Sequence, residues 1–553
     1  MNKKAFAGLF LLIVLGGIAF RLADLGRRPM HHDEANQALK FAALLETGEY
    51  RYDKTDHHGP SLYYLTLPFA WISGKGSLAD LDERTIRSVP ACFGAATIIL
   101  LLLFIPPLGR KPVLWSALGL AVSPVMVYFG RFYIQESLLL FFLVAAVACL
   151  WRYLLKPAWG WAATTGFSCG LMYATKETSV IAFGSAAAAL LLIRLGGVRI
   201  GKGSKLGRDS GVGEEENSGT GQHPAKRRAG ESSRISRRPG SGFRWAHLVL
   251  GLGAGLLVSF LLFSSFFRNP GGFFDSLVAF KVYFVRAGEG GFHVHPWPYY
   301  LQMLAFSKTV AGPLWSEAVI LLLALVGGAA AFGRKPPADG NILFPKFLLF
   351  FTLFSTAVYS LIPYKTPWNV LPFYIGFVLL AGCGAQFLLD SCRKNVVRAV
   401  VAVLLAAGFL HLGVQAYHAN FTRPADPLNP YVYAQTSPDL LKLVNRVEDL
   451  AALHPDGNGM LIKVVAGPYE TWPLPWYLRR FNRVGYWTDA AAAGGPGDAA
   501  VFITDTEQAG RLESILNESF LSEYYGLRPN VFLVLHIRSD LWEEFLKTRD
   551  GDT

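Results

Sequence analysis

Residues 3–34 read KKAFAGLFLLIVLGGIAFRLADLGRRPMHHDE, an apolar stretch that ends in an acidic pair. The span from Ala5 to Leu25 has about the 20 residues that a helix needs to cross a bilayer. Two lysines precede it and favour a cytoplasmic N-terminus. The span lacks an early small-residue cleavage site, so we expect a retained anchor rather than a signal peptide. The acidic pair Asp33 and Glu34 is then expected at the outer membrane surface.

The rest of the chain has the composition of a polytopic α-helical membrane protein. Hydrophobic residues make up 52% and aromatic residues 14% of the 553 residues, more than soluble proteins of this size carry. The net charge of +12 comes largely from Lys and Arg in loops between apolar segments, which indicates topology rather than nucleic-acid binding. We predict eleven transmembrane helices, the first one and ten near 84–107, 112–130, 136–154, 159–175, 177–195, 245–267, 311–333, 342–362, 367–389 and 396–416. An odd number places the C-terminus outside.

This span pattern divides the chain into four parts. Residues 1–195 form a first transmembrane module whose outer loop, 26–83, carries the acidic pair, and residues 245–418 form a second module. Residues 196–244 are rich in Lys, Arg, Gly and Ser, which favours a disordered basic cytoplasmic loop; a patch that binds anionic lipid or nucleic acid is the alternative. Residues 419–553 are less apolar, and we predict a small extracytoplasmic α/β domain there. Its expected strands lie near 460–465, 500–504 and 531–537, and an expected helix near 440–453.

Six polar clusters fall on the predicted outer face. They are 31–34 (His-His-Asp-Glu), 56–58 (Asp-His-His), 131–136 (Arg-Phe-Tyr-Ile-Gln-Glu), 176–177 (Lys-Glu), 293–295 (His-Val-His) and 364–366 (Tyr-Lys-Thr). Charged residues at membrane depth are costly and are usually paired or kept for function. Each one alone could be a snorkelling or ion-paired side chain, but their collection on one face favours a shared site. Two short helices, 34–46 and 61–72, are expected to lie along this face. The first has its apolar residues on one side, namely Ala38, Phe41, Leu44 and Leu45.

The acidic pair offers two interpretations. Asp33 could be a general base at a reaction centre, or it could cap the helix that follows it. Glu34 could share the catalytic role, or it could be a first-turn acid that orients a ligand. Both residues are predicted here as catalytic candidates.

Basic residues and histidines supply the other candidate ligands. Lys176, Lys365, Arg131 and Arg286 could bind an anionic group such as a phosphate, with lipid headgroups as the alternative partner. Imidazole and carboxylate groups are usual ligands of divalent metals. A possible metal site is therefore predicted from four histidines, although their spacing matches no recognised metal motif: His32, His57, His293 and His295.

Several of these motifs occur in an order that resembles a known superfamily. The motifs are Asp33-Glu34, the stretch 58–64 (His-Gly-Pro-Ser-Leu-Tyr-Tyr), 87–90 (Arg-Ser-Val-Pro), 175–176 (Thr-Lys) and 365–369 (Lys-Thr-Pro-Trp-Asn). Together they resemble the GT-C integral-membrane glycosyltransferases, especially the branch of protein O-mannosyltransferases and the lipid A aminoarabinose transferase. Within that superfamily the chain is similar to a prokaryotic group described as flippase-activity-associated. It departs from the aminoarabinose enzymes at His58, which stands where they have a lysine.

The resemblance implies an enzyme that moves a sugar, with inversion, from a polyprenyl-phosphate donor to an acceptor hydroxyl at the outer face. Asp33 would accept the proton of the hydroxyl. Lys176, with Arg131 or Lys365, would stabilise the leaving phosphate, and Glu34, Glu136 and the pair His57-His58 would position sugar or metal. The implied substrate-binding residues are His58, Arg131, Tyr133, Glu136, Lys176, Glu177, Tyr364 and Lys365.

The resemblance also implies partners and a location. They are a polyprenyl-phosphate sugar, a lipid, glycan or protein acceptor, and the lipids of a prokaryotic plasma membrane, with no nucleic acid. Two other functions stay open: a flippase or transporter of lipid-linked glycans, whose charges would line a path through the membrane, and a non-catalytic partner of a glycan-assembly complex. Tyr469, Trp472 and Tyr477 could stack on carbohydrate or simply pack the C-terminal domain against the membrane surface.

Overall fold

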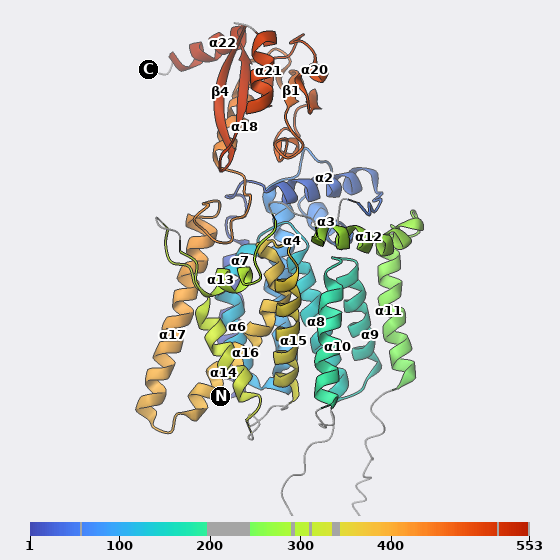
Figure 1. Ribbon diagram of the computed structural model, residues 1–553, viewed down its shortest axis with the longest axis vertical. Coiled ribbons are helices and arrows are strands. Elements are labelled where there is room, and N and C mark those ends of the chain that lie inside the picture. The colour runs from blue at the N-terminus through green and yellow to red at the C-terminus, as the bar shows by residue number, and fades with distance from the viewer. Residues whose placement is uncertain are drawn as a thin grey trace, which may run out of the picture.

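The computed structural model describes residues 1–55, 58–195, 244–288, 293–308, 312–333, 343–516 and 519–550. Figure 1 shows a bundle of long helices, a layer of shorter helices across one end of the bundle, and a small domain with a sheet beyond that layer. We call the end of the bundle beneath these shorter helices the capped face. The predicted basic loop 196–244 falls, except for Arg244, outside the described residues.

Seven helical stretches in the described residues are long and apolar enough to cross a membrane. They are α1 (Lys3–Leu22), α4 with η1 and α5 (Glu83–Leu108), α8 (Glu136–Leu155), α11 (Trp245–Phe263), α15 (Leu343–Leu361), η2 with α16 (Pro367–Ser391) and α17 with η3 (Asn395–Thr422). The other predicted spans hold shorter helices: α6 (Arg110–Val122) with α7 (Pro124–Phe129), α9 (Trp159–Tyr173), α10 (Ser179–Leu195) and α14 (Ala318–Ala330). The polytopic helical architecture is confirmed, whereas the count of eleven membrane crossings is not.

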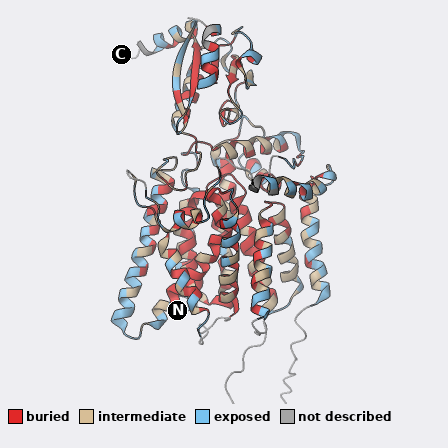
Figure 2. Ribbon diagram, viewed as in Figure 1, coloured by how far each residue is buried: buried red, intermediate tan, exposed pale blue. Residues whose placement is uncertain are grey.

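Burial separates a central from a peripheral set of membrane helices. In the most apolar window of α16, 83% of the residues are buried inside the protein, and 72% in α8. The corresponding shares are 17% for α17 and 22% for α11, and Figure 2 shows these two flanking helices mostly in the colours of exposed and intermediate residues. Their exposed side chains are apolar, for example Leu404 and Leu256. The flanking helices therefore present a surface suited to lipid chains.

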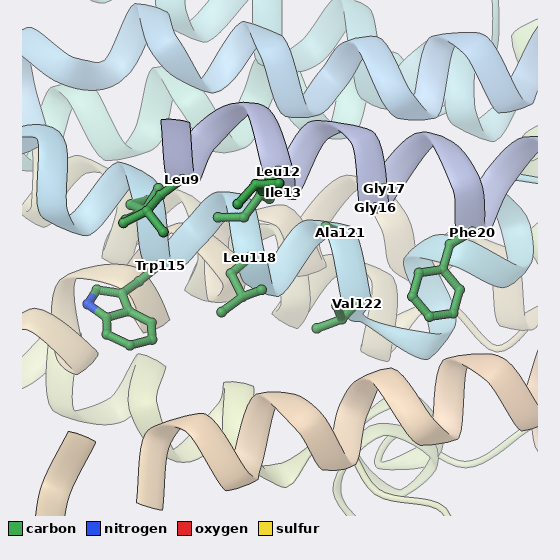
Figure 3. A pocket seen from close by; sticks show the side chains of 11 residues that line it. Leu9, Leu12, Ile13, Gly16, Gly17, Phe20, Trp115, Leu118, Ala121 and Val122 are labelled. Carbon is green, nitrogen blue, oxygen red and sulfur yellow. The ribbon is translucent and has the colours of Figure 1, made fainter. Parts of the chain in front are cut away.

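Some neighbouring helices of the bundle pack tightly and others leave a groove between them. Between α9 and α11, a Cβ atom on Gly166 would lie only 1.8 Å from the Gly251 carbonyl oxygen, so the two backbones touch because neither position has a side chain. Between α1 and α6, by contrast, an apolar groove of about 500 Å³ runs along the helices from Leu9 to Phe20 (Figure 3). Trp115 and Leu118 of α6 form its other wall.

Four helices form the layer over the capped face: α2 (His32–Thr47), α3 (Ser61–Ile72), α12 (Gly271–Gly288) and α13 (Tyr299–Ala305). The helices predicted at 34–46 and 61–72 are α2 and α3. Of the apolar residues predicted for one side of α2, Ala38, Phe41 and Leu44 are buried and Leu45 is half-buried, so this helix lies with that side against the bundle.

The C-terminal domain contains a five-stranded mixed sheet with the order β2-β1-β3-β5-β4. β1 pairs in parallel with β2 and β3, while β5 pairs antiparallel with β3 and β4. The strands are β1 (Ile462–Val465), β2 (Val484–Trp487), β3 (Val501–Asp505), β4 (Phe520–Arg528) and β5 (Val531–Arg538), and the helices are α18 (Asp439–Leu453), α19 (Leu474–Tyr477), α20 (Ala490–Ala493), α21 (Thr506–Leu516) and α22 (Ser539–Asp550). The predicted α/β domain is confirmed with its three predicted strands and one helix, and β2 and β4 were not predicted.

The C-terminal domain docks on the loop that leads into α2 and on the first residues of α2 and α4. The Tyr477 hydroxyl accepts a hydrogen bond from the Met30 backbone N–H at 2.8 Å, and the Trp476 indole donates to the Glu83 carboxylate at 2.8 Å. Trp472 stacks on His32, with ring centroids 5.4 Å apart. These contacts support the packing interpretation of Trp472 and Tyr477, while Tyr469 is 70% exposed.

Candidate active site

The first turn of α2 is fixed by a histidine cap. The His31 Nδ1 accepts the Asp33 backbone N–H at 3.0 Å, and the Nε2 lies 3.0 Å from the Tyr433 carbonyl oxygen. The ring is therefore the neutral tautomer that donates from Nε2. Burial lowers the pKa of His31 and favours this neutral form, although the carboxylates of Asp33 and Glu34 partly oppose the shift. His31, and not Asp33, is the helix cap, so the capping interpretation of Asp33 is wrong.

Glu34 is the centre of a buried ion-pair network. The guanidinium of Arg87 donates to its two oxygens at 2.8 and 2.7 Å, and Arg28 donates at 3.3 Å. Backbone N–H groups of His31 and Tyr133 donate at 3.1 and 2.9 Å. Burial by itself would raise the pKa of Glu34, but the two guanidinium groups outweigh it and lower the pKa to about 2. With no exposed surface and both oxygens occupied, Glu34 does not fit the predicted catalytic role; it is a first-turn acid that positions α2.

Asp33 lies beside this network in the opposite environment. Its side chain is 42% exposed. It also faces His293: burial lowers the pKa of that histidine, and the negative charge of Asp33 partly opposes the shift. A carboxylate that is accessible and held on a rigid helix start can accept a proton from a bound hydroxyl.

A wall of aromatic rings stands next to Asp33. The Tyr433 hydroxyl lies 2.8 Å from His293 Nδ1 and 3.4 Å from His295 Nε2. Its ring packs edge-on against Trp368, with centroids 5.9 Å apart, and Trp368 also packs edge-on against His31 at 5.7 Å. The cluster 293–295 thus meets the cluster 31–34 through residues of two other segments.

The cluster 364–366 joins the same wall. Val294 and Tyr364 form an antiparallel bridge, and the Tyr364 ring lies 4.7 Å from that of His293. Lys365 points elsewhere: its ammonium donates to the carbonyls of Ile362 and His295 at 2.6 and 2.9 Å. Lys365 is 1% exposed and closes the loop, so it does not fit the predicted role as a phosphate ligand.

Lys176 and Glu136 form a second buried pair at the capped face. The Lys176 ammonium bonds the Glu136 carboxylate and also donates to the Asn369 side-chain oxygen at 3.0 Å. Asn369 follows Trp368 in the chain, so the motif 365–369 connects this pair to the aromatic wall beside Asp33. The predicted residues Lys176 and Glu136 are therefore brought into the neighbourhood of the site.

His58 and Glu177 extend the site on its other side. His58 Nδ1 lies 2.7 Å from a Glu177 oxygen and 3.1 Å from the Tyr283 hydroxyl, and the Tyr52 hydroxyl donates to Glu177 at 3.3 Å. The loop fits because it contains Gly59: a Cβ atom there would lie 2.2 Å from the Ala174 carbonyl oxygen. The stretch that begins at His58 is thereby clamped next to Lys176 and Glu177.

Two predicted substrate-binding residues have structural roles. Arg131 donates to four backbone carbonyls at the end of α1, those of Phe20, Arg21, Ala23 and Asp24, at 2.6 to 3.2 Å. Tyr133 is completely buried and its hydroxyl bonds Thr66 at 2.8 Å. Neither side chain fits the predicted contact with substrate, because Arg131 caps a helix and Tyr133 packs the core.

The predicted metal ligands that the structure describes, His32, His293 and His295, do not form a cluster with other ligand side chains. Among the described residues, no three His, Cys, Asp or Glu side chains lie together as a metal site requires. His32 stacks on Trp472, whereas His293 and His295 both contact the Tyr433 hydroxyl. His57 falls outside the described residues, as does the side chain of Arg286.

Two residues that build the site, Tyr433 and Glu317, belong to no recognisable sequence motif and were not predicted. Tyr433 lies in the segment before α18, where no pattern marks it. Glu317, directly before α14, fixes this segment: its buried carboxylate accepts hydrogen bonds from Tyr431, Tyr374 and Ser123 at 2.9, 2.6 and 2.5 Å. The signal for Glu317 was an acid at the start of an apolar helix, where charge is costly.

Comparisons with known proteins agree with this architecture. A sequence model of the dolichyl-phosphate-mannose-protein mannosyltransferase family matches residues 48–202, and no curated protein sequence matches the chain. The crystal structure of ArnT from Cupriavidus metallidurans in the apo state is similar over 97% of this chain and 99% of that one, with 14% identity and a TM-score of 0.61. The archaeal oligosaccharyltransferase AglB from Archaeoglobus fulgidus is similar over 98% of this chain and 77% of its own, with 11% identity and a TM-score of 0.54.

The protein O-mannosyltransferase complex of S. cerevisiae is similar over 81% of this chain and 92% of that one, with 11% identity and a TM-score of 0.55. At sequence identities this low, structural similarity supports a shared fold but does not indicate a shared substrate. The chain therefore has the GT-C fold of integral-membrane glycosyltransferases, which the motifs between Asp33 and Asn369 predicted.

Proposed function

We propose that this protein is a membrane glycosyltransferase that moves a sugar from a polyprenyl-phosphate donor to an acceptor hydroxyl, with inversion at the anomeric carbon. The observation that carries the proposal is Asp33, a 42% exposed carboxylate whose backbone is fixed by the buried pair Glu34 and Arg87. An accessible base on a rigid support is what a direct displacement at a sugar carbon requires.

In the proposed reaction the acceptor oxygen attacks the anomeric carbon while the bond from that carbon to the phosphate oxygen breaks. The electron pair of the broken bond leaves with the polyprenyl phosphate, and the hydroxyl proton passes to Asp33. The new bond forms on the face opposite the departing phosphate, which inverts the carbon. The aromatic wall of Trp368, Tyr433 and Tyr364 offers ring faces that suit the apolar faces of a sugar.

The leaving phosphate gains charge as the bond breaks, and preorganised cations and donors stabilise such charge best. We place it toward Lys176 and His58. Both are held by carboxylates, Glu136 and Glu177 respectively, so their positions are set before the donor binds. Arg131 and Lys365 are left out of this role because backbone carbonyls occupy their donors.

A lipid-linked donor suits the position of the site at the end of the membrane helices. Among structures of the same fold, ArnT has been seen with undecaprenyl phosphate, AglB with a dolichol phosphate and an inhibitory peptide, and the yeast complex with its sugar donor. We place the capped face and the C-terminal domain on the extracytoplasmic side of a prokaryotic plasma membrane. The acceptor belongs to the lipids, glycans or proteins accessible there.

The test is transfer of radiolabelled sugar by the purified protein from a panel of polyprenyl-phosphate donors to a crude envelope fraction. The Asp33→Asn variant should lose transfer. The matched control is Asp24→Asn, which removes an equally exposed carboxylate, 45% against 42%, on the same face; it should retain transfer. Equal transfer by Asp33→Asn and wild type would remove Asp33 as the base, and absence of transfer by wild type across the panel would favour a transporter or a non-catalytic partner.

A further inference from the structure

Three arginines line a small cavity at the capped face, behind the Glu34 network. They are Arg28, Arg87 and Arg131, and Leu25, Asn420 and Pro424 complete the wall. The cavity has about 10 Å³ for the centre of a water-sized sphere, which is room for one water molecule or one monoatomic ion. The three arginine residues are only 1% to 6% exposed, so bulk solvent screens their charges poorly.

Two of these charges have compensating partners. Arg87 forms its two-point contact with Glu34. Arg131 donates to the last carbonyls of α1, where a helix end carries roughly half a negative charge. Both guanidinium groups are therefore at least partly neutralised by the protein itself.

The guanidinium charge of Arg28 is the least compensated of the three. It shares Glu34 with Arg87 at the longer distance of 3.3 Å, and its other contacts are the Arg131 carbonyl at 3.2 Å and the neutral Tyr128 side chain. Its guanidinium carbon lies 3.9 Å from the centre of the Phe132 ring, and its buried Nε has no hydrogen-bond partner among the described residues. A buried cation with an unused donor beside a polar cavity needs an anion.

A fourth guanidinium strengthens this imbalance. Arg21 in α1 is 1% exposed and donates to the carbonyls of Gly17, Leu120 and Ala121, while its Nε is also buried without a partner in the described part of the chain. Its Nε lies beside Gly130, the residue before Arg131, so Arg21 adds a further buried guanidinium next to Arg131, whereas Glu34 is bonded only by Arg28 and Arg87. Helix-end carbonyls offset part of the excess but carry no full charge.

We propose that this cavity binds a single chloride ion as a structural component of the capped face. A cavity of this size excludes phosphate, sulfate and carboxylate ligands, and the surplus of guanidinium charge favours a halide over a water molecule. The ion would tie together the end of α1, the segment before α2 and the π-helical turn η3 (His418–Thr422), from which Asn420 reaches the cavity. It would thereby hold Arg28 against Glu34 and stabilise the start of the helix that carries Asp33. This inference does not depend on the proposed transferase activity.

The first experiment measures the thermal unfolding midpoint of the purified full-length protein in sodium chloride, sodium bromide and sodium gluconate at equal ionic strength. Chloride and bromide should raise the midpoint above that in gluconate, by about 2–4 °C. The rise should continue with the logarithm of the halide concentration above saturation. Crystals grown in bromide should show one anomalous peak at this cavity. Equal midpoints in all three salts, or an anomalous map without a peak there, would overturn the proposal and leave a water molecule in the cavity.

A charge-replacement variant tests the site itself. Asn420 is 3% exposed and its side-chain NH2 donates to the Ala416 carbonyl at 2.8 Å. Asn420→Asp gives up this bond and places a carboxylate of the same shape at the cavity wall, where it should substitute for the halide. The variant should lose the response of the midpoint to chloride. The control Arg398→Gln removes a 49% exposed arginine from the opposite end of the bundle and should keep the response. An equal chloride response in wild type and Asn420→Asp would show a general salt effect and reject the site. If Asn420→Asp does not fold, the midpoints of wild type in the three salts and the bromide anomalous map decide between chloride and water.

Discussion

Asp33 and Glu34 are neighbours in the chain, yet they belong to two regions of opposite physical character. Glu34 lies in a region of buried charge, where Arg87, Arg28 and two backbone N–H groups occupy both of its oxygens. Asp33 lies in a region of histidine and aromatic rings, with an accessible carboxylate. Two adjacent residues in the first turn of α2 therefore supply one carboxylate used for structure and one available for chemistry.

The difference shows how a helix start can serve two purposes. Successive residues of a helix point about 100° apart, so the second and third residues of α2 project toward different surroundings. The buried side fixes the backbone, and a fixed backbone gives the exposed side a defined position. This division predicts that the two acids can be separated by experiment: one substitution should remove activity and the other stability.

The largest effect is expected for Asp33→Asn in sugar transfer. Loss of a general base lowers the rate by about 100- to 10,000-fold. Stability should change by less than about 1 kcal/mol, because the change removes only a favourable charge in the first turn of α2. The measurement is initial-rate transfer together with thermal unfolding of the same preparation. A variant that unfolds several degrees early would show that Asp33, too, is structural and would erase the contrast.

A large effect on stability is expected for Glu34→Gln. Removing the charge leaves Arg87 and Arg28 buried around a neutral amide, and breaking a buried ion pair by removing one partner costs about 3–5 kcal/mol. Chemical or thermal unfolding in detergent measures this loss. The control is Glu523→Gln, which removes a carboxylate that is 23% exposed and paired with Arg446 in the C-terminal domain; it should cost less. Equal stability of Glu34→Gln and wild type would contradict the assignment of Glu34 as the organising charge.

A smaller effect is expected for Tyr433→Phe in the aromatic wall. The change removes the hydroxyl that lies between His293 and His295 but keeps the ring that packs on Trp368. One lost hydrogen bond of this kind is worth about 1 kcal/mol, so transfer should fall about fivefold. The control Tyr469→Phe removes a hydroxyl from a 70% exposed side chain and should leave transfer unchanged. If transfer fell as far as it does in Asp33→Asn, the Tyr433 hydroxyl would have to take part in the proton transfer that is assigned to Asp33.

Much of this fold follows from sequence because each element obeys a local rule. Apolar stretches of span length predicted the membrane helices, and the apolar side of 34–46 predicted α2. The helix count did not follow, since Pro124 begins a new helix after α6 and several predicted spans hold helices too short to cross alone. Strands β2 and β4 were missed because β2 has four residues and no buried face, and β4 has several exposed positions.

The site was predictable in its location and less so in its roles. Collecting charged clusters on one face identified the segments that meet around Asp33. What a sequence could not show is which cations are already engaged: Arg131 and Lys365 have the right chemistry for phosphate, but backbone carbonyls from distant or neighbouring segments occupy them. Tyr433 joins the site only through the docking of the segment before α18, which no local pattern encodes.

The smallest predicted effect concerns pH and the cap of α2. Burial lowers the folded-state pKa of His31 below its ordinary value of 6.5, so its contribution to stability is present above that value and is lost as the pH falls below it. Protonation puts a hydrogen on Nδ1 and breaks the cap, a loss of about 1 kcal/mol. Buried His536, whose pKa is lowered to about 4, adds a loss of the same sign. The difference between wild type and His31→Asn in unfolding between pH 7.5 and 5 isolates the His31 contribution. Asparagine caps without titrating, and the variant keeps the contributions of His536, His293 and His295, whose pKa values burial also lowers. Parallel pH profiles of the two proteins would show that the His31 cap survives protonation.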